Sequence, residues 1–212
     1  MRVKTCALAV AAVLCSGAAL AQQAEGNWMM RVRAVDIQAV QKSDPIGALA
    51  LPADAVYVSN KVIPEVDFSY FFSKNLAAEL ILTYPQTLDV QVNGVGKVGN
   101  LDALPPTLTL QYHFSPDTAF RPYVGAGINL TLFSKVSLPV VNALTGADSS
   151  LDRSSVGAAL QVGFDYKVGP NSYVNFDVKK TYMQTDLKVN GTKVSTVTVD
   201  PVLVGIGYGF KF

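Results

Sequence analysis

Apolar and polar residues alternate along most of the chain, and the alternation is clearest in residues 107–114 and 121–131. In both segments every second side chain is apolar, whereas those between are mostly small or carry a hydroxyl or an amide. A period of two residues predicts β-strands, and the connector 115–119, which contains Pro and Asp, predicts a hairpin. A strand of a soluble sandwich would carry charged residues freely on its second face. The small polar residues found here favour a narrow, enclosed lumen.

Eight segments of this kind follow one another, and each has an apolar face of about the length that a tilted membrane strand needs. They are residues 27–37, 61–72, 76–84, 107–114, 121–131, 156–168, 173–182 and 199–212. An even number of strands allows the sheet to close without an exposed edge. The predicted fold class is therefore all-β, an eight-stranded antiparallel transmembrane β-barrel formed by residues 22–212.

The connections between these segments alternate in length. The short ones are residues 73–75, 115–119 and 169–171, and the long ones are 38–60, 85–105, 133–155 and 184–198. Short periplasmic turns and long extracellular loops are typical of outer-membrane barrels, so we expect the bacterial outer membrane, with both termini in the periplasm. Asn93-Gly94 and Asn190-Gly191 lie in two long connections and predict type I′ hairpin turns beyond the bilayer.

Residues 1–21 have a different pattern, with two basic residues, an apolar run at 6–14 and a final Ala-Leu-Ala. This is the pattern of a secretory signal peptide with its cleavage site. The alternative, a transmembrane helix, is disfavoured because the apolar run is too short to span a bilayer. Both cysteines, Cys6 and Cys15, lie in this leader, so the mature chain would offer no disulfide, reactive thiol or cysteine metal ligand.

The charge balance of the mature chain excludes several partner classes. Without Arg2 and Lys4, 15 of the 17 basic residues remain against 16 acidic ones, which gives a net charge near −1. No basic field is available to attract nucleic acid, so no nucleic-acid partner is expected. His113 is the single histidine, which excludes a multi-histidine metal site, and no cofactor is expected.

Charged residues on the predicted inward faces occur with both signs. They are Arg31, Arg33, Arg121 and Lys179 on one side and Glu65, Asp67, Glu79, Asp165 and Asp177 on the other. An eight-stranded barrel has room for little more than side chains, and unpaired charges inside it would cost several kcal/mol. We therefore predict that these groups pair across neighbouring strands and form a polar plug, which argues against an open aqueous pore.

Paired carboxylates also fit acid–base catalysis, so these residues allow an enzymatic interpretation. We favour structural pairing and expect no enzyme activity. His113 lies inward near the periplasmic end of its strand, whereas an enzyme acting on lipid needs a histidine that head groups can reach, so we expect His113 only to form hydrogen bonds. Lys180 falls on the lipid-facing register; either it snorkels to an interface or the register shifts by one residue there.

Four stretches carry a more specific pattern. They read NLAAELILTYPQT (75–87), LPPTLTLQYHF (104–114), FRPYVGAGINLTLF (120–133) and KVNGTKVSTVTVDPVLVGIGYGF (188–210). Together with the opening strand, they are similar to the OmpW family of small outer-membrane β-barrels over nearly the whole mature chain. The specific part is the combination of LPPTL, FRPYVGAG and VDP before an aromatic C-terminal strand.

The resemblance implies a barrel that passes small hydrophobic molecules, including alkanes in some relatives, through the outer membrane. The implied route is an apolar funnel at the external end, blocked below by the polar plug, with lateral exit through the wall into the bilayer. An apolar solute gains roughly 25 cal/mol per Å² of surface on leaving water, while lipopolysaccharide bars its direct access to the membrane. The expected partners are outer-membrane lipid, lipopolysaccharide and small hydrophobic solutes.

Apolar residues of the long connections are candidates for the funnel wall, with ordinary packing within loops as the alternative. They are Leu49, Leu51, Val56, Val58, Leu138, Val140, Val141 and Leu144. Val156 is also included. It stands at the start of its strand, where many members of the family have a tryptophan, so we do not expect an aromatic gate at that position. Pro85 and Pro139 cannot donate to a β-ladder and mark places where the wall would loosen. The terminal aromatic residues Tyr208, Phe210 and Phe212 are expected to signal to the barrel-assembly machinery.

Three functions remain open on the sequence alone. The first is a transport barrel for small hydrophobic solutes. The second is a non-conducting barrel that acts as a stress-related, adhesion, phage or bacteriocin receptor surface. The third is a barrel enzyme acting on lipid, which would require Ser, His and an acid within hydrogen-bond reach. We favour transport.

Overall fold

The structure is a computed structural model that describes residues 26–39, 42–45, 52–146 and 148–212. The predicted leader at 1–21 lies outside these ranges. The strands are β1 (Trp28–Gln38), β2 (Lys42–Ser43), β3 (Val56–Val58), β4 (Lys61–Phe71), β5 (Leu76–Leu82), β6 (Gln86–Val92), β7 (Gly96–Leu104), β8 (Thr107–His113), β9 (Phe120–Ser137), β10 (Ser149–Leu151), β11 (Ser154–Lys167), β12 (Ser172–Thr181), β13 (Gln184–Val189), β14 (Thr192–Thr198) and β15 (Val202–Lys211), and the helix is α2 (Pro139–Thr145). Within the described ranges, no helix is both long enough and apolar enough to cross a membrane.

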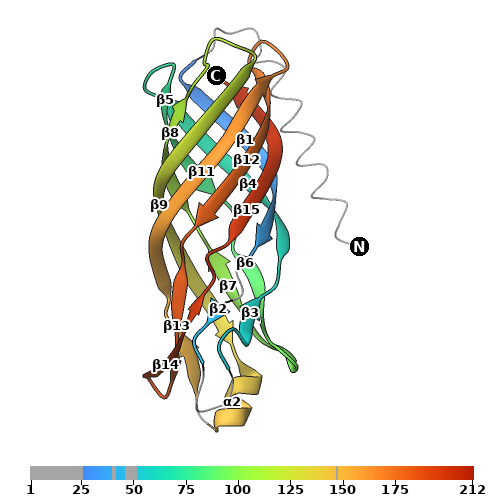
Figure 1. The fold of residues 1–212 in the computed structure, drawn as a ribbon, viewed down its shortest axis with the longest axis vertical. Coiled ribbons are helices and arrows are strands. Elements are labelled where there is room, and N and C mark those ends of the chain that lie inside the picture. The colour runs from blue at the N-terminus through green and yellow to red at the C-terminus, as the bar shows by residue number, and fades with distance from the viewer. Residues whose placement is uncertain (1–25, 40–41, 46–51, 147) are drawn as a thin grey trace.

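Eight of the strands form an antiparallel ring in the order β11-β12-β15-β1-β4-β5-β8-β9, and pairing between β9 and β11 closes it. Figure 1 shows a tall barrel with tilted strands, with the C-terminus and the short connections at one end. We call this end the turn end, and the opposite end, where α2 lies, the loop end. The predicted eight-stranded antiparallel barrel is confirmed.

The two faces of each barrel strand have opposite character. In β8 the inward Thr109, Gln111 and His113 are buried, whereas the outward Leu110 is 52% exposed. A soluble protein would bury the apolar face and expose the polar one. This reversal is the arrangement of a barrel whose outer surface is covered by lipid.

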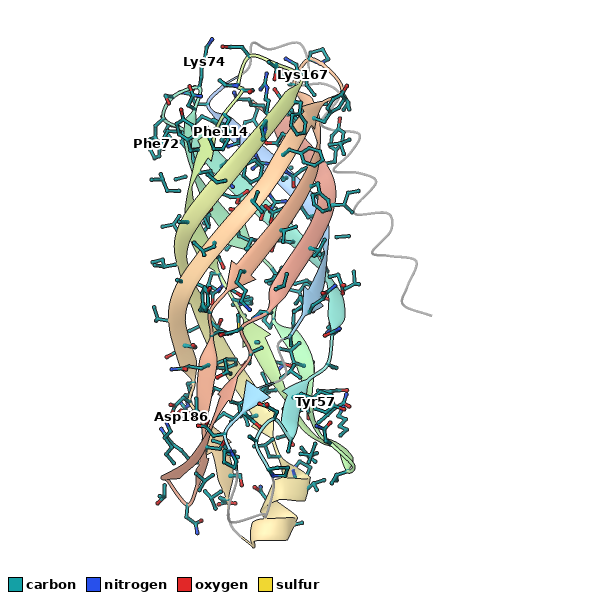
Figure 2. All side chains as sticks on the ribbon, in the orientation of Figure 1. Tyr57, Phe72, Lys74, Phe114, Lys167 and Asp186 are labelled. Carbon is teal, nitrogen blue, oxygen red and sulfur yellow. The ribbon has the colours of Figure 1, made fainter. Side chains whose placement is uncertain are left out.

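Aromatic side chains gather on the outer surface near the turn end. The ring centroids of Tyr70 and Phe72 lie 5.3 Å apart, and those of Tyr112 and Phe114 lie 5.2 Å apart. Phe72 and Phe114 are both exposed, and Figure 2 labels them at this level, with Lys74 closer to the tip. Such girdles mark a membrane–water interface, so one membrane boundary lies at this level.

The predicted assembly-signal residues lie on the last strand, beside the first. Tyr208 and Phe212 are exposed on the outer surface, whereas Phe210 is largely covered and stacks on Phe212 with centroids 6.3 Å apart. The backbone of Phe212 exchanges hydrogen bonds of 3.1 and 2.8 Å with Trp28. The end of the chain therefore joins its beginning in the closed ring.

The long connections are largely folded into strands that extend the barrel at the loop end. One extension sheet continues from β9 in the order β9-β7-β6-β3, and the other is β10-β13-β14-β2. β9 itself runs to Ser137, beyond the predicted end at Thr131. In Figure 1 both sheets project beyond the ring, with α2 at their tip. Beyond the closed ring, the wall thus continues as two separate sheets. The division between them falls in the β1–β4 connection, whose strands β2 and β3 belong to different sheets, and in the β9–β11 connection.

The two Asn-Gly pairs form different turns. Asn190 and Gly191 both have positive φ, of 48° and 77°, which is the predicted type I′ turn between β13 and β14. Between β6 and β7, Gly94 has a φ of 78° and Asn93 does not have a positive φ. The type I′ prediction is therefore wrong at Asn93-Gly94, because a three-residue connection closes this hairpin, with positive φ at Gly94 and at Gly96, the first residue of β7.

An apolar core of its own holds the two extension sheets together. Its buried members are Val90, Val92, Val98, Leu101, Ala103, Phe133, Leu138, Leu187 and Val197. They come from both sheets and from the start of the α2 connection, so the extension packs as a small sandwich continuous with the barrel wall.

Candidate functional site

Two arginines of β1 are the centre of an ion-pair network that crosses the lumen. Arg31 Nη2 lies 2.6 Å from Asp165 Oδ2, and Arg31 Nη1 lies 2.9 Å from Glu79 Oε1. Arg33 lies 3.0 Å from Glu79 Oε1 and 3.0 Å from Asp67 Oδ2. Because Asp165 belongs to β11 and Glu79 to β5, the arginines connect strands that are not neighbours in the ring.

A second set of pairs adjoins this centre. Lys179 Nζ on β12 lies 3.1 Å from Glu65 Oε2 on β4, and Arg33 Nη1 lies 3.2 Å from Glu65 Oε1. Arg33 also lies 3.7 Å from Asp177 Oδ1, and it sits directly opposite Glu65 in the β1–β4 register. Eight of the nine predicted plug residues are thus buried in one network, which we call the plug.

Arg121, the ninth predicted plug residue, lies at the turn-end edge of the lumen and is only half-buried. Its Nη1 donates to the hydroxyl of Tyr173 at 2.7 Å, and its Nε donates to the carbonyl of Thr118 at 3.0 Å. Arg121 therefore lines a cavity on the turn-end side of the plug, together with His113 and Asp165.

Neutral side chains complete the plug by hydrogen-bonding to its carboxylates. Gln161 Nε2 donates to Glu79 and to Asp177, each at 2.8 Å, and Gln111 Nε2 donates to Glu79 at 2.6 Å. The Tyr123 hydroxyl donates to Asp177 at 2.9 Å. A network this closely bonded argues against an open aqueous channel at its level. The sequence analysis missed these neutral members, although they share the inward register of the charged residues.

His113 lies at the turn-end side of the plug. Its Nε2 is 3.2 Å from Gln111 Oε1, and its ring lies between those of Phe71 and Tyr123, each 5.0 Å away. The geometry matches the expected hydrogen-bonding role. In the described part of the chain, no group of three or more His, Cys, Asp or Glu side chains is arranged to hold a metal ion.

A glycine on β15 makes room for one of the arginines. A Cβ atom at Gly207 would lie 2.2 Å from the carbonyl oxygen of Val32 and 2.7 Å from Cγ of Arg33. Only glycine allows the two strands and the arginine stem to lie this close.

Lys180 keeps the predicted register and faces outward near the loop end of β12. It lies opposite Leu160 and Val202 in the adjacent strands. Its Nζ donates to the carbonyl of Asp200 and lies 5.7 Å from the ring centroid of Tyr182. Of the two explanations raised by the sequence, snorkelling applies.

A mainly apolar cavity lies directly on the loop-end side of the plug. Glu65 and Lys179 form its floor, and the free volume is about 50 Å³. The other lining residues are Ile37, Ile63, Ile81, Leu82, Thr83, Gln86, Leu88, Ala103, Pro105, Thr107, Asn129, Thr131, Thr181, Met183, Val199, Pro201 and Leu203. Val58, Met183 and Val199 pack together as a small apolar cluster toward the loop end. The cavity is therefore narrow and is covered by apolar side chains.

The barrel wall beside this cavity is interrupted. Pairing between β4 and β5 runs only as far as Val66 and Leu82, and pairing between β3 and β6 resumes at Val58 and Val90. We call the interval between them, residues 59–65 facing 83–89, the seam.

Few bonds cross the seam among the described residues. The Thr83 hydroxyl donates to the carbonyl of Pro64 at 2.9 Å, Lys61 Nζ donates to the carbonyl of Thr87 at 3.0 Å, and the Ser59 amide donates to the carbonyl of Asp89 at 3.3 Å. Pro64 and Pro85 have no amide hydrogen to give, which explains why no ladder forms. Cavity-lining residues from both edges, including Ile63 and Leu88, flank the seam.

The structure places the candidate funnel residues in several environments. Val58 and Leu138 are buried in apolar clusters, and Val140 packs against the extension core. Leu49 and Leu51 lie outside the described residues, as do the side chains of Val56, Val141 and Leu144. Val156 is 74% exposed and points outward, so its assignment to the funnel is wrong. Its register places it on the same face as the lipid-facing Leu160.

The residues that do line the cavity were missed by the sequence analysis. Ile63 shares the inward register of Glu65, Ile81 that of Glu79, and Leu203 that of the inward glycines of β15. At the loop ends of these strands both faces become apolar. That loss of alternation is the signal by which the cavity wall could have been found.

Comparison with known proteins places this geometry among outer-membrane barrels. Residues 24–212 match the sequence profile of the OmpW family. The chain is 43% identical over 191 residues to the uncharacterized outer-membrane protein y4mB of Sinorhizobium fredii, covering 87% of this chain and 80% of the relative. It is 32% identical over 177 residues to the outer membrane protein AlkL of Ectopseudomonas oleovorans, covering 79% and 73%.

A solved structure supports the same placement. The crystal structure of the outer membrane protein OprG from Pseudomonas aeruginosa is similar with a TM-score of 0.77 at 28% sequence identity, and the match covers 90% of this chain and 98% of that one.

Proposed function

Because the chain belongs to the OmpW family of outer-membrane β-barrels, we propose that it admits small hydrophobic molecules at the loop end and releases them sideways into the bilayer. The observation that carries this proposal is the position of the apolar cavity, which lies on the polar plug and beside the seam. A solute in the cavity meets the buried ion pairs of the plug on its turn-end side and the unpaired strands of the seam at its side. Lateral exit is then the route that avoids the plug.

The proposed orientation places the turn end in the periplasm and the loop end outside. Short turns at one end and long, strand-rich connections at the other support it. The extension would carry the apolar interior through the lipopolysaccharide layer, with outer-membrane lipid around the barrel. The barrel-assembly machinery would recognise the aromatic β15, and the protein would act without enzyme chemistry.

An uptake experiment tests the proposal. Cells that lack the protein, cells that produce it and cells that produce Ala103→Trp would be given a labelled medium-chain alkane. Ala103 lines the cavity and is buried, so a large indole there would fill the narrow space. Uptake should depend on the protein and fall in the variant, whereas Ala158→Trp on the exposed outer face should keep it. Equal uptake in all strains would overturn transport and favour the non-conducting receptor surface.

A disulfide across the seam tests the exit route. Extending the β4–β5 register past Val66 and Leu82 brings Pro64 opposite Tyr84, and both side chains are exposed on the outer face, so the pair Pro64→Cys and Tyr84→Cys is suitable for oxidation. Closing the seam should lower uptake, and a reductant should restore it. A matched pair at Phe68 and Leu80, which face each other in the intact β4–β5 ladder, should leave uptake unchanged. Full uptake through the oxidised seam would contradict lateral release there.

A further inference from the structure

Two buried polar atoms in the cavity wall have no hydrogen-bond partner among the described residues. They are Oε1 of Gln86 and Oγ1 of Thr181, and each side chain is only 2% exposed. Both residues line the apolar cavity on the loop-end side of the plug. A buried polar atom without a partner lowers stability, so two of them in one cavity call for a binding function.

The orientation of the Gln86 amide is fixed by its own bond. Gln86 Nε2 donates to the carbonyl of Tyr84 at 3.0 Å, which leaves Oε1 as the free end of the amide. A carbonyl oxygen can only accept, so its partner must be a hydrogen-bond donor. The Thr181 hydroxyl can either donate or accept.

Neighbouring polar groups of the cavity are already partnered. Lys179 binds Glu65, and the Thr83 hydroxyl binds the carbonyl of Pro64. The Asn129 amide donates to Thr107, and the Thr131 hydroxyl donates to Asn129. Among these polar groups, the unpartnered atoms are therefore confined to Gln86 on β6 and Thr181 on β12. They do not reflect a general lack of hydrogen bonds around the cavity.

We propose that the cavity selects small amphiphiles whose head group carries a hydroxyl, with the head at Gln86 and Thr181 and the tail against apolar lining residues such as Ile63 and Leu203. A hydroxyl can donate to Gln86 Oε1, and it can also exchange a hydrogen bond with the Thr181 hydroxyl. A carboxylate fits poorly, because Glu65 already neutralises Lys179 and Gln86 Oε1 would repel the negative charge. This inference rests on the proposed function and narrows its substrate class from small hydrophobic molecules in general to those that carry a hydroxyl.

Three six-carbon probes test the head-group preference. 1-Hexanol donates and accepts a hydrogen bond, its isomer methyl pentyl ether only accepts one, and hexane does neither. Binding would be measured by ligand-observed NMR on the full barrel in lipid nanodiscs, with empty nanodiscs correcting for partition into lipid. The alcohol should bind about three- to tenfold more tightly than the ether, the range expected for one net hydrogen bond.

Variants identify the atoms responsible. Gln86→Met removes the free acceptor at similar volume and should abolish the preference, and Thr181→Val should reduce it. Thr185→Val is the matched control, because Thr185 is also buried but does not line the cavity. Equal binding of the two isomers, or a preference that survives Gln86→Met, would overturn the inference.

The uptake assay in cells separates this head-group inference from the proposed transport function on which it rests. Uptake that depends on the protein but does not distinguish 1-hexanol from its ether isomer would overturn only the head-group inference. No protein-dependent uptake of hexane, the ether or the alcohol would overturn the proposed transport itself.

Discussion

At the scale of single residues, the stability of the folded barrel depends on the pairing of the charges buried in its lumen. Arg33 lies within 3.2 Å of carboxylate oxygens from Glu65, Asp67 and Glu79. Removing one partner of such a buried network leaves uncompensated charge, which costs far more than the loss of an exposed pair.

Arg33→Met should therefore destabilise the barrel by about 3–5 kcal/mol. Lys74→Met is the control, since the pair of Lys74 with Asp117 is 72% exposed on both sides and should be worth less than about 1 kcal/mol. Urea unfolding in lipid vesicles, followed by tryptophan fluorescence, would measure both. Similar losses from the two variants would contradict the network as a source of stability.

Glycine positions on β15 give a second residue-scale prediction. Gly207→Ala should cost about 1–3 kcal/mol, because its Cβ would lie 2.2 Å from a backbone oxygen that cannot move aside easily. Gly205→Ala should cost clearly less, since the nearest atom there is a side-chain methyl at 3.2 Å. The same unfolding assay would compare the two, and equal costs would contradict the close approach at Gly207.

At the scale of elements, the sequence predicts the strands that lipid surrounds better than those beyond it. The alternation around Leu110 or Glu79 is strict because one face meets lipid and the other meets the plug. In β6 and β7 this contrast weakens, since Val90 and Val98 pack on the extension core and polar residues face solvent. The plug charges were therefore found from their register, whereas the cavity wall was not, because Ile63 and Ile81 interrupt the polar face.

The β13–β14 hairpin should be sensitive to acid. Asp186, labelled in Figure 2, lies 2.8 Å from Lys193 Nζ and accepts a 2.9 Å bond from the Thr196 hydroxyl, and these contacts hold the pKa of its carboxyl below the usual value. The lowered pKa stabilises the folded hairpin above the unfolded pKa of about 4, and this contribution is lost as the pH falls through the folded pKa. The protection factors for amide hydrogen exchange in β13 and β14 should fall over this pH range in the native protein. In Asp186→Asn this acid step should be absent, and its persistence would assign the effect to another group.

At the scale of the whole molecule, the packed extension core bears on the proposed transport. Leu187 on β13 shares one buried apolar cluster with Leu101 and Val90 of the opposite sheet, so the core fills the interior at the loop end. Under the proposed function, a solute would pass only when the two extension sheets separate. The barrier to uptake would then lie in the extension and not in the barrel.

Leu187→Ala should weaken the extension core by about 2–5 kcal/mol and raise the rate of alkane uptake. Hydrogen exchange should quicken in the extension sheets and stay slow in the barrel strands around the plug. Lower uptake with an intact barrel would contradict access through the separating sheets.

The continuation of the closed ring into two separate extension sheets has a mechanical consequence. β9 belongs to one sheet and is continuous with the barrel, while β13 in the other sheet follows directly on β12, which carries Lys179. Under the proposed transport, the two sheets would act as levers that pivot at the ion pairs of the plug. A stiff pivot would confine their separation to the loop end, so the protein would open toward its solutes while the turn end stays closed.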